Sequence, residues 1–165
     1  MDTSDSIPLE ETLEALGELV KQGKVRQIGL SNETPWGTMK YLELAETKSL
    51  PRVASIQNAY NLVNRGFEIG LSEVAMHEQV GLLAYSPLAQ GTLTGKYLGG
   101  QMPQGSRLAL FGDGPLMMRY KGDKTRQAIE MYVNLAKKYE IDPAQLAIQF
   151  CNIQPFVTST IIGAT

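Results

Sequence analysis

Short apolar stretches alternate along this chain with stretches of helical periodicity, and this alternation constrains the fold more than any other feature. Each apolar stretch is followed by polar residues or glycine, where the chain can turn before the next helix. Such alternation is typical of right-handed β-α units around a parallel sheet. The sequence therefore predicts an α/β fold with about four strands and flanking helices. The strands are expected at residues 25–32, 53–58, 81–87 and 159–165, and the helices at about 8–23, 34–48, 66–79, 125–139 and 143–152.

Local signals support three of the helix starts. Pro8 suits the first position of a helix, Thr34-Pro35 opens another, and Asp142 caps a third with Pro143 at its first position. By contrast, residues 99–122 are rich in glycine and proline and are too long for a simple connector.

Composition excludes several classes of function. The 165 residues suffice for one domain, and a net charge of −2 with scattered basic residues argues against a nucleic-acid or anionic-membrane surface. Cys151 and His77 are the only residues of their types, which leaves neither a disulfide nor a cysteine or histidine metal cage. Because no apolar run is long enough to span a membrane and no signal peptide is evident, we expect a cytoplasmic protein.

The stretch SPLAQGTLTGKY, residues 86–97, superficially resembles a triphosphate-binding loop. The Walker pattern needs four residues between its glycines and a serine or threonine after the lysine. Here three residues separate Gly91 from Gly95, and Tyr97 follows Lys96. The triphosphate interpretation therefore fails, and either another kind of phosphate site or a plain turn stays open.

Polar side chains stand where the predicted strands end. Parallel sheets of this class gather their active groups at the carboxyl ends of the strands. The residues expected there are Ser31, Asn32, Gln57, Asn58, Tyr85, Ser86, Gly163 and Thr165.

Together these motifs resemble the aldo-keto reductase family, whose members are eight-stranded β/α barrels that use a nicotinamide dinucleotide. The resemblance implies half of a (β/α)8 TIM barrel, with residues 1–165 as a single partial domain whose first half and final segment are missing. The matching stretches come in the family's order and cover nearly the whole chain: GKVRQIGLSN, IQNAYN, LLAYSPLAQGTLTGKY, the Ser106–Arg107 pair, DPAQLAIQF and IIGAT.

The resemblance also implies residues that bind the nicotinamide end of the cofactor. Ser31 and Asn32 match a pair that hydrogen-bonds the carboxamide, and Gln57 matches a side chain that contacts the same group. Tyr85 matches an aromatic residue that stacks on the nicotinamide ring. Hydroxyl and amide groups suit a carboxamide, and a flat ring adds about 1 kcal/mol beyond area burial.

A second group of matching residues lies toward the phosphates. Lys96 and Arg107 match basic residues that meet the phosphates across a long strap-like loop, and lysine and arginine suit phosphate chemically. Gly163 and Thr165 match the start of the segment that holds the adenosine phosphate. The loop along the pyrophosphate is matched by Ser86, Pro87, Leu88, Ala89 and Gln90.

No catalytic residue is assigned. The family's proton donor is a tyrosine, supported by a lysine and an aspartate with a histidine nearby, and all four lie in the first half of the barrel. His77 falls within an expected helix, and Tyr41 and Tyr60 do not match the donor's position. The resemblance implies an NADP-dependent oxidoreductase that reduces small carbonyl substrates, with this chain as its cofactor-binding half. The segment that selects NADP over NAD is missing, which leaves NAD open.

Other interpretations remain. The chain can be a catalytically silent nucleotide-binding module, like the potassium-channel β-subunits that share this fold, or an inactive truncated product. Tyr85 can be a buried barrel residue, Lys96 a solvated loop charge and Arg107 a residue of a mobile surface loop.

Half of a barrel also exposes two sheet edges. The side chains expected to point inward, Ile28, Leu30, Ile56 and Leu83, then lack facing partners. Because unpaired edges favour association, we expect a homodimer formed through these edges, or aggregation.

Overall fold

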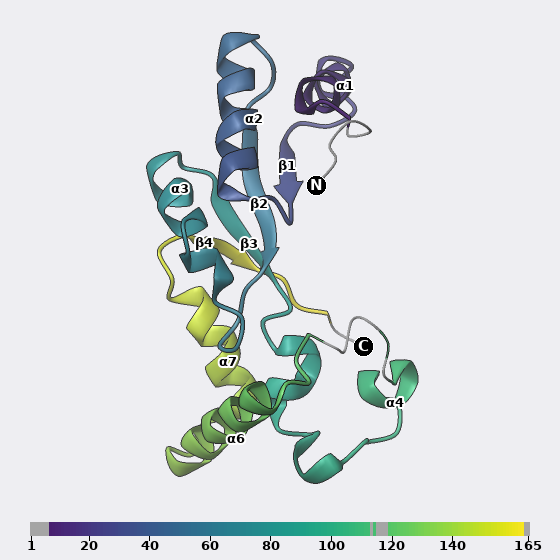
Figure 1. Ribbon diagram of the computed structural model, residues 1–165, viewed down its shortest axis with the longest axis vertical. Coiled ribbons are helices and arrows are strands. Elements are labelled where there is room, and N and C mark those ends of the chain that lie inside the picture. Colours follow the sequence, from purple (N-terminus) through teal and green to yellow (C-terminus); the bar gives the residue numbers. More distant parts are fainter. Residues whose placement is uncertain (1–6, 113, 115–118, 164–165) are drawn as a thin grey trace. The chain divides into compact units, whose positions relative to one another are not determined.

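The structure is a computed structural model that describes residues 7–112, 114 and 119–163 (Figure 1). Four parallel strands alternate with helices, and their order in the sheet is β1-β2-β3-β4. The strands are β1 (Ile28–Ser31), β2 (Val53–Ala59), β3 (Gly81–Tyr85) and β4 (Val157–Thr160). The α-helices are α1 (Leu9–Lys21), α2 (Pro35–Thr47), α3 (Leu71–His77), α4 (Arg107–Phe111), α6 (Asp123–Lys138) and α7 (Pro143–Asn152), and the 3-10 helices are η1 (Gly66–Glu68), η2 (Ala89–Thr94) and η3 (Leu98–Gly100). The predicted α/β class is confirmed, and the arrangement is consistent with a partial (β/α)8 barrel.

The chain forms two compact units. The first contains Met1–Asn58 and Glu68–Leu83, and the second contains Ala59–Phe67 and Ala84–Thr165. The expectation that residues 1–165 form a single partial domain stays a prediction.

In the first unit, apolar side chains from β1 and β2 meet those of the covering helices. Ile28 and Leu30 alternate with exposed residues along β1, and they pair in parallel register with Val53 and Ile56 of β2. Figure 1 shows α2 running alongside β2, and α1 contacts α2, where Leu13 is fully buried. The buried faces of these elements therefore form the core of this unit.

In the second unit, η2 packs against α6 and α7. Ala89 and Leu93 of η2 share a buried cluster with Val133 of α6 and Ala147 of α7. Gly95 ends η2 in a left-handed conformation, and a β-carbon there would lie 2.9 Å from Val133 Cγ1. Glycine at this position thus allows the loop after β3 to lie directly on α6.

The helix starts predicted at Thr34 and at Asp142 are confirmed. Thr34 Oγ1 accepts a hydrogen bond from Gly37 N, and Asp142 Oδ1 accepts from Ala144 N and Gln145 N. The prediction for Pro8 is wrong by one residue, because Pro8 has an extended ψ of 139° and α1 begins at Leu9.

Several element boundaries also differ from the sequence prediction. The strand predicted over residues 25–32 is shorter in the structure and spans Ile28–Ser31. Its predicted start is taken up by the turn that closes α1, where Lys24 N and Val25 N donate hydrogen bonds to Leu19 O. Residues 66–79 are not one helix, since Gly70, with φ of +100°, separates η1 from α3.

The end of the last strand and the side chains expected to point inward also differ from the prediction. β4 ends at Thr160, and the apolar residues that suggested a longer strand, Ile161 and Ile162, are exposed. The expectation that Ile28, Leu30 and Ile56 lack facing partners is wrong, because all three are buried in the core of the first unit. On β3 the buried side chains are Leu82 and Ala84, and Leu83 between them is half-buried. A continuous apolar strand gives no alternation from which to read its buried face.

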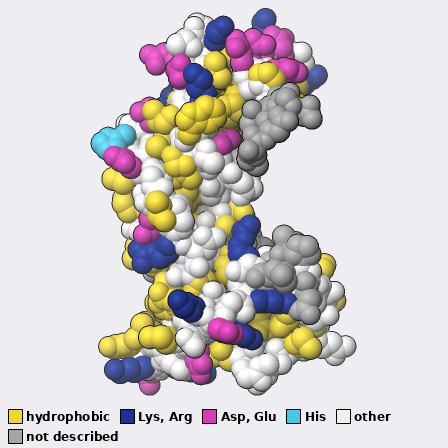
Figure 2. Space-filling view, viewed as in Figure 1, with side chains coloured by type: hydrophobic (Ala, Val, Ile, Leu, Met, Phe, Trp, Pro, Cys, Tyr) yellow, Lys and Arg dark blue, Asp and Glu magenta, His cyan; other side chains and the backbone are white. Residues whose placement is uncertain are grey.

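The surface is mixed in charge. Figure 2 shows acidic and basic side chains interspersed over the first unit at the top of the view. None of the helices within the described residues has both the length and the apolar character needed to cross a bilayer.

Candidate cofactor site

The structure brings Ser31, Asn32 and Gln57 together in the first unit. Ser31 and Gln57 are paired across β1 and β2. Ser31 Oγ donates to Gln57 O at 3.3 Å, Asn32 N donates to the same oxygen at 3.0 Å, and Asn32 Nδ2 donates to Ser31 Oγ at 3.2 Å. The three residues therefore form one hydrogen-bonded group, and all three are exposed.

Asn58, the next residue on β2, is used differently. Its Nδ2 donates to Glu33 O at 3.3 Å, which ties the end of β2 to the segment entering α2. Its Oδ1 is buried without a hydrogen-bond partner among the described residues. Asn58 is therefore a structural tie, in contrast to the exposed Gln57.

In the second unit, the loop after β3 concentrates left-handed backbone conformations. Ser86, Ala89 and Gln90 have φ values of 54°, 47° and 61°, and Gly91 follows at 93°. Each non-glycine residue in this region costs about 1–3 kcal/mol and persists only where its surroundings hold it. Strain of this kind gathers at ligand-binding sites, and here it falls on the loop matched to the pyrophosphate.

Asn61 is the buried residue that holds this loop. Its Nδ2 donates to Ser86 O at 2.9 Å and to Tyr120 Oη at 3.0 Å, while its Oδ1 accepts from Val63 N at 3.0 Å. Asn61 is fully buried, and all three contacts lie within the second unit. Sequence reasoning missed this role, although an asparagine directly after a buried tyrosine, at the end of the motif IQNAYN, was a usable signal.

Tyr85 has a basic neighbour that sequence reasoning also missed. Its hydroxyl accepts a hydrogen bond from Arg119 Nη1 at 3.4 Å. This contact is the main cause that raises the pKa of the Arg119 guanidinium. Arg119 lies in the glycine- and proline-rich stretch, and no pattern in the sequence connects it to β3.

The two basic residues matched to the phosphates are both exposed in the second unit. Lys96 folds over Gly91, where a β-carbon would lie 2.9 Å from Lys96 Cε. Arg107 is the first residue of α4, whose preceding residue Ser106 accepts a hydrogen bond from Ala109 N.

The remaining predicted residues differ in setting. Pro87 is buried and Leu88 packs against the core cluster, so any contact they make to a ligand would come from the backbone. Gly163 is exposed beyond β4. Thr165 lies outside the described residues.

In chemical type these side chains fit a nicotinamide dinucleotide. Ser31, Asn32 and Gln57 offer donors and acceptors for a carboxamide, and Lys96 and Arg107 offer cations for phosphates. The Gln90 Oε1 atom is buried without a partner among the described residues, a costly arrangement that is often associated with function. The residues matched to the carboxamide lie in the first unit, and those matched to the phosphates lie in the second. That both sets bind one cofactor molecule therefore stays a prediction.

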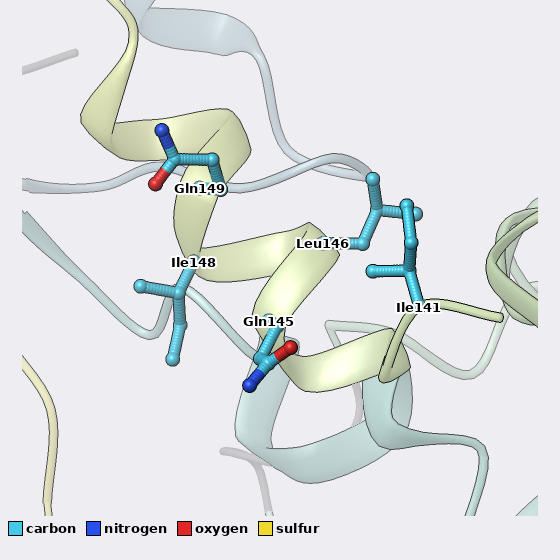
Figure 3. Close-up of a pocket in the computed structure, with 5 residues that line it drawn as sticks. All are labelled: Ile141, Gln145, Leu146, Ile148 and Gln149. Atoms are coloured by element: carbon cyan, nitrogen blue, oxygen red, sulfur yellow. The ribbon is translucent and has the colours of Figure 1, made fainter. Parts of the chain in front are cut away.

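A hollow lined mainly by residues of α7 is not this site. It has a volume of about 480 Å³ and is lined by Ile141, Gln145, Leu146, Ile148 and Gln149. Figure 3 shows Ile141 and Leu146 side by side, with Ile148 and Gln149 on the other side of the helix. None of the predicted cofactor residues lines it.

Cys151 and His77 are apart from the candidate site. Cys151 is buried on α7, where its Sγ donates to Tyr60 O at 3.5 Å, and burial raises the pKa of its thiol to about 11. His77 is exposed in the last turn of α3, as expected for a helical residue. No group of three or more histidine, cysteine, aspartate or glutamate side chains suited to a metal ion occurs in the described part of the chain.

Comparison with known proteins gives consistent matches over the whole chain. A model described as the aldo/keto reductase family matches residues 2–165. "Protein tas" of Escherichia coli (strain K12) is 51% identical over 164 residues, which cover 99% of this chain and 46% of that protein. An "Aldo-keto reductase" of Babesia bovis is 43% identical over 99% of this chain and 59% of its own length. The "L-glyceraldehyde 3-phosphate reductase" of E. coli (strain K12) is 34% identical over 98% of this chain and 47% of its own length. The chain thus spans about half the length of the curated relatives it matches.

Proposed function

The chain belongs to the aldo/keto reductase family, and we propose that it forms the cofactor-binding half of an NADP-dependent reductase that converts aldehydes or ketones to alcohols. A bound NADPH supplies the hydride for this reaction. The residues of this chain are proposed to bind and orient the cofactor. NAD is the alternative cofactor, because none of the proposed binding residues is assigned to distinguishing NADP from NAD.

The observation that carries this proposal is the strained loop after β3. Ser86, Ala89 and Gln90 adopt left-handed conformations at the positions matched to the pyrophosphate loop. A loop held in this way presents a fixed backbone surface to a ligand at little further entropic cost. The buried Asn61 supports this assignment, because its Nδ2 donates a hydrogen bond to Ser86 O and so holds the start of the loop.

The hydrogen-bonded group in the first unit is proposed to bind the carboxamide of the cofactor's nicotinamide ring. Ser31, Asn32 and Gln57 would fix the orientation of the nicotinamide ring through its carboxamide. Tyr85 would stack on the ring, with its hydroxyl already held by Arg119. Orienting the ring selects the face from which the hydride leaves, so positioning is the contribution of these residues to catalysis.

A nucleotide-binding module without turnover is the second candidate. It is favoured by the setting of two tyrosines, Tyr41 within α2 and Tyr60 directly after β2. Tyr41 and Tyr60 are buried in the cores of their units, and burial raises the pKa of Tyr41. Neither offers an exposed hydroxyl that can protonate a substrate.

Two measurements on the purified chain test the proposal. Titration with NADPH, followed by fluorescence, is expected to give saturable binding, and the absence of binding would overturn the proposal. Aldehyde reduction is expected to stay at background, since loss of the general acid alone costs about 10²–10⁴-fold. Steady NADPH consumption with a simple aldehyde, surviving further purification, would contradict the assignment of this chain to cofactor binding alone.

A further inference from the structure

Tyr97 connects the two basic positions that the proposed function assigns to the cofactor's phosphates. Its ring lies beside the Lys96 ammonium, with Nζ 5.3 Å from the ring centroid. Its hydroxyl oxygen accepts a hydrogen bond from Leu108 N at 3.4 Å. Leu108 follows Arg107 at the start of α4, so one side chain contacts both segments.

The Lys96 contact restricts a side chain that would otherwise be free in solvent. A β-carbon on Gly91 would lie 3.1 Å from Lys96 Nζ and 3.5 Å from Tyr97 Oη, so both groups lie over the same glycine. A long charged side chain loses up to about 2 kcal/mol of rotamer entropy when it is fixed. A lysine already held against a ring has less entropy to lose on meeting a phosphate.

The Leu108 contact stabilises the first turn of α4. The first N–H groups of a helix lack intrahelical partners, and a five-residue helix has little else to stabilise it. Ser106 Oγ accepts from Ala109 N at 3.3 Å, and Tyr97 Oη accepts from Leu108 N. Tyr97 therefore acts as a second cap for the turn that carries Arg107.

We propose that Tyr97 is a positioning residue for the phosphate end of the cofactor, acting through its ring on Lys96 and through its hydroxyl on the turn that carries Arg107. This inference rests on the proposed function. Tyr97 itself is not required to touch the cofactor.

The test is NADPH binding by the whole chain with Tyr97→Phe and Tyr97→Leu, each alone and combined with Lys96→Ala. Tyr97→Leu is expected to weaken binding about two- to fivefold beyond Tyr97→Phe, the range of an exposed cation–π contact. That gap should shrink at high salt and vanish in the Lys96→Ala background. A purely structural role for the ring would preserve the gap in both conditions.

Tyr139→Leu is the matched control. The centroid of the Tyr139 ring lies 5.6 Å from Lys138 Nζ at the end of α6, so the two residues form the same kind of cation–π pair as Tyr97 and Lys96. Tyr139→Leu is expected to leave NADPH binding unchanged. Equal weakening by Tyr139→Leu, or a gap that persists without Lys96, overturns the inference while the proposed function stands. Absence of NADPH binding by the unaltered chain overturns both.

A second measurement needs no cofactor and covers the case in which Tyr97→Leu folds poorly. The Lys96 Hε protons are expected to show an upfield ring-current shift in NMR spectra of the unaltered chain and of Tyr97→Phe. Random-coil shifts for these protons in the well-folded Tyr97→Phe variant and in the unaltered chain would overturn the inference.

Discussion

Tyr85 and Lys96 are proposed to hold different parts of the cofactor by different forces. Tyr85→Ala removes a stacking surface, and we expect NADPH affinity to fall by about 1 kcal/mol or somewhat more, with little salt dependence. Lys96→Ala removes an exposed charge, whose contribution is screened as ionic strength rises. Fluorescence titrations at low and high salt measure both responses.

Tyr139→Ala and Lys138→Ala serve as controls for these two substitutions, since they remove an exposed ring and its neighbouring cation on the same unit. Both are expected to bind NADPH like the unaltered chain. If Tyr85→Ala and Lys96→Ala respond to salt in the same way, the assignment of the two residues to opposite ends of the cofactor is wrong.

Cys151 is expected to be inert to thiol reagents at neutral pH and to make stability depend on pH. Burial raises the pKa of its thiol to about 11, so the folded state keeps the proton that the unfolded state loses at lower pH. The contribution of Cys151 to stability is therefore constant below the unfolded pKa and is lost as pH rises toward 11. Urea unfolding at pH 8 and pH 10 measures this loss.

Cys151→Ala isolates the effect from that of other groups. The variant is expected to lose less stability between the two pH values than the unaltered chain. An identical pH dependence for the two proteins, or fast labelling of native Cys151 by a thiol reagent at pH 7, would contradict the buried, protonated thiol.

For single residues, the sequence predicted which side chains meet on adjacent strands better than it predicted contacts made by loop residues. The proximity of Ser31 to Gln57 follows from two adjacent parallel strands that end together. The contacts of Asn61 with Tyr120 and of Arg119 with Tyr85 join residues far apart in sequence, through a loop whose path no local pattern determines.

Helix α7 gives the clearest prediction at the scale of one element. Asp142 Oδ1 accepts hydrogen bonds from Ala144 N at 2.8 Å and Gln145 N at 3.1 Å. Asp142→Ala is expected to cost about 1 kcal/mol of unfolding free energy, because it leaves both N–H groups without their acceptor. Asp142→Asn keeps an acceptor and should stay close to the unaltered chain. Urea denaturation of both variants checks this, and equal stabilities for the two would contradict the capping role.

Element starts with a capping residue were predictable, whereas several ends were not. Thr34-Pro35 and Asp142-Pro143 fix helix starts through local hydrogen bonds and a preset φ, which sequence encodes directly. The break at Gly70 depends on a left-handed conformation in a stretch that otherwise has helical periodicity. The end of β4 before Ile161 and Ile162 depends on what these exposed apolar residues can pack against, and no local pattern reports that.

For the whole molecule, the open sheet predicts self-association. β1 and β4 are the first and last strands of the order β1-β2-β3-β4, so each has one side without a neighbouring strand among the residues that the structure describes. We expect a homodimer or larger species by size-exclusion chromatography with light scattering, with the monomer fraction rising on dilution. A monodisperse monomer that unfolds in one cooperative transition at low concentration would contradict this and would support residues 1–165 as a self-sufficient domain.

The central claim is that both groups of residues, one in each unit, bind a single nicotinamide dinucleotide. Amide NMR spectra of the ¹⁵N-labelled chain during titration with NADPH test it directly. We predict that Ser31, Asn32 and Gln57 shift together with Tyr85, residues 86–91 and Lys96, along one saturation curve. Shifts confined to one of the two groups, or centred on Ile141 to Gln149 of the α7 hollow, would contradict the claim.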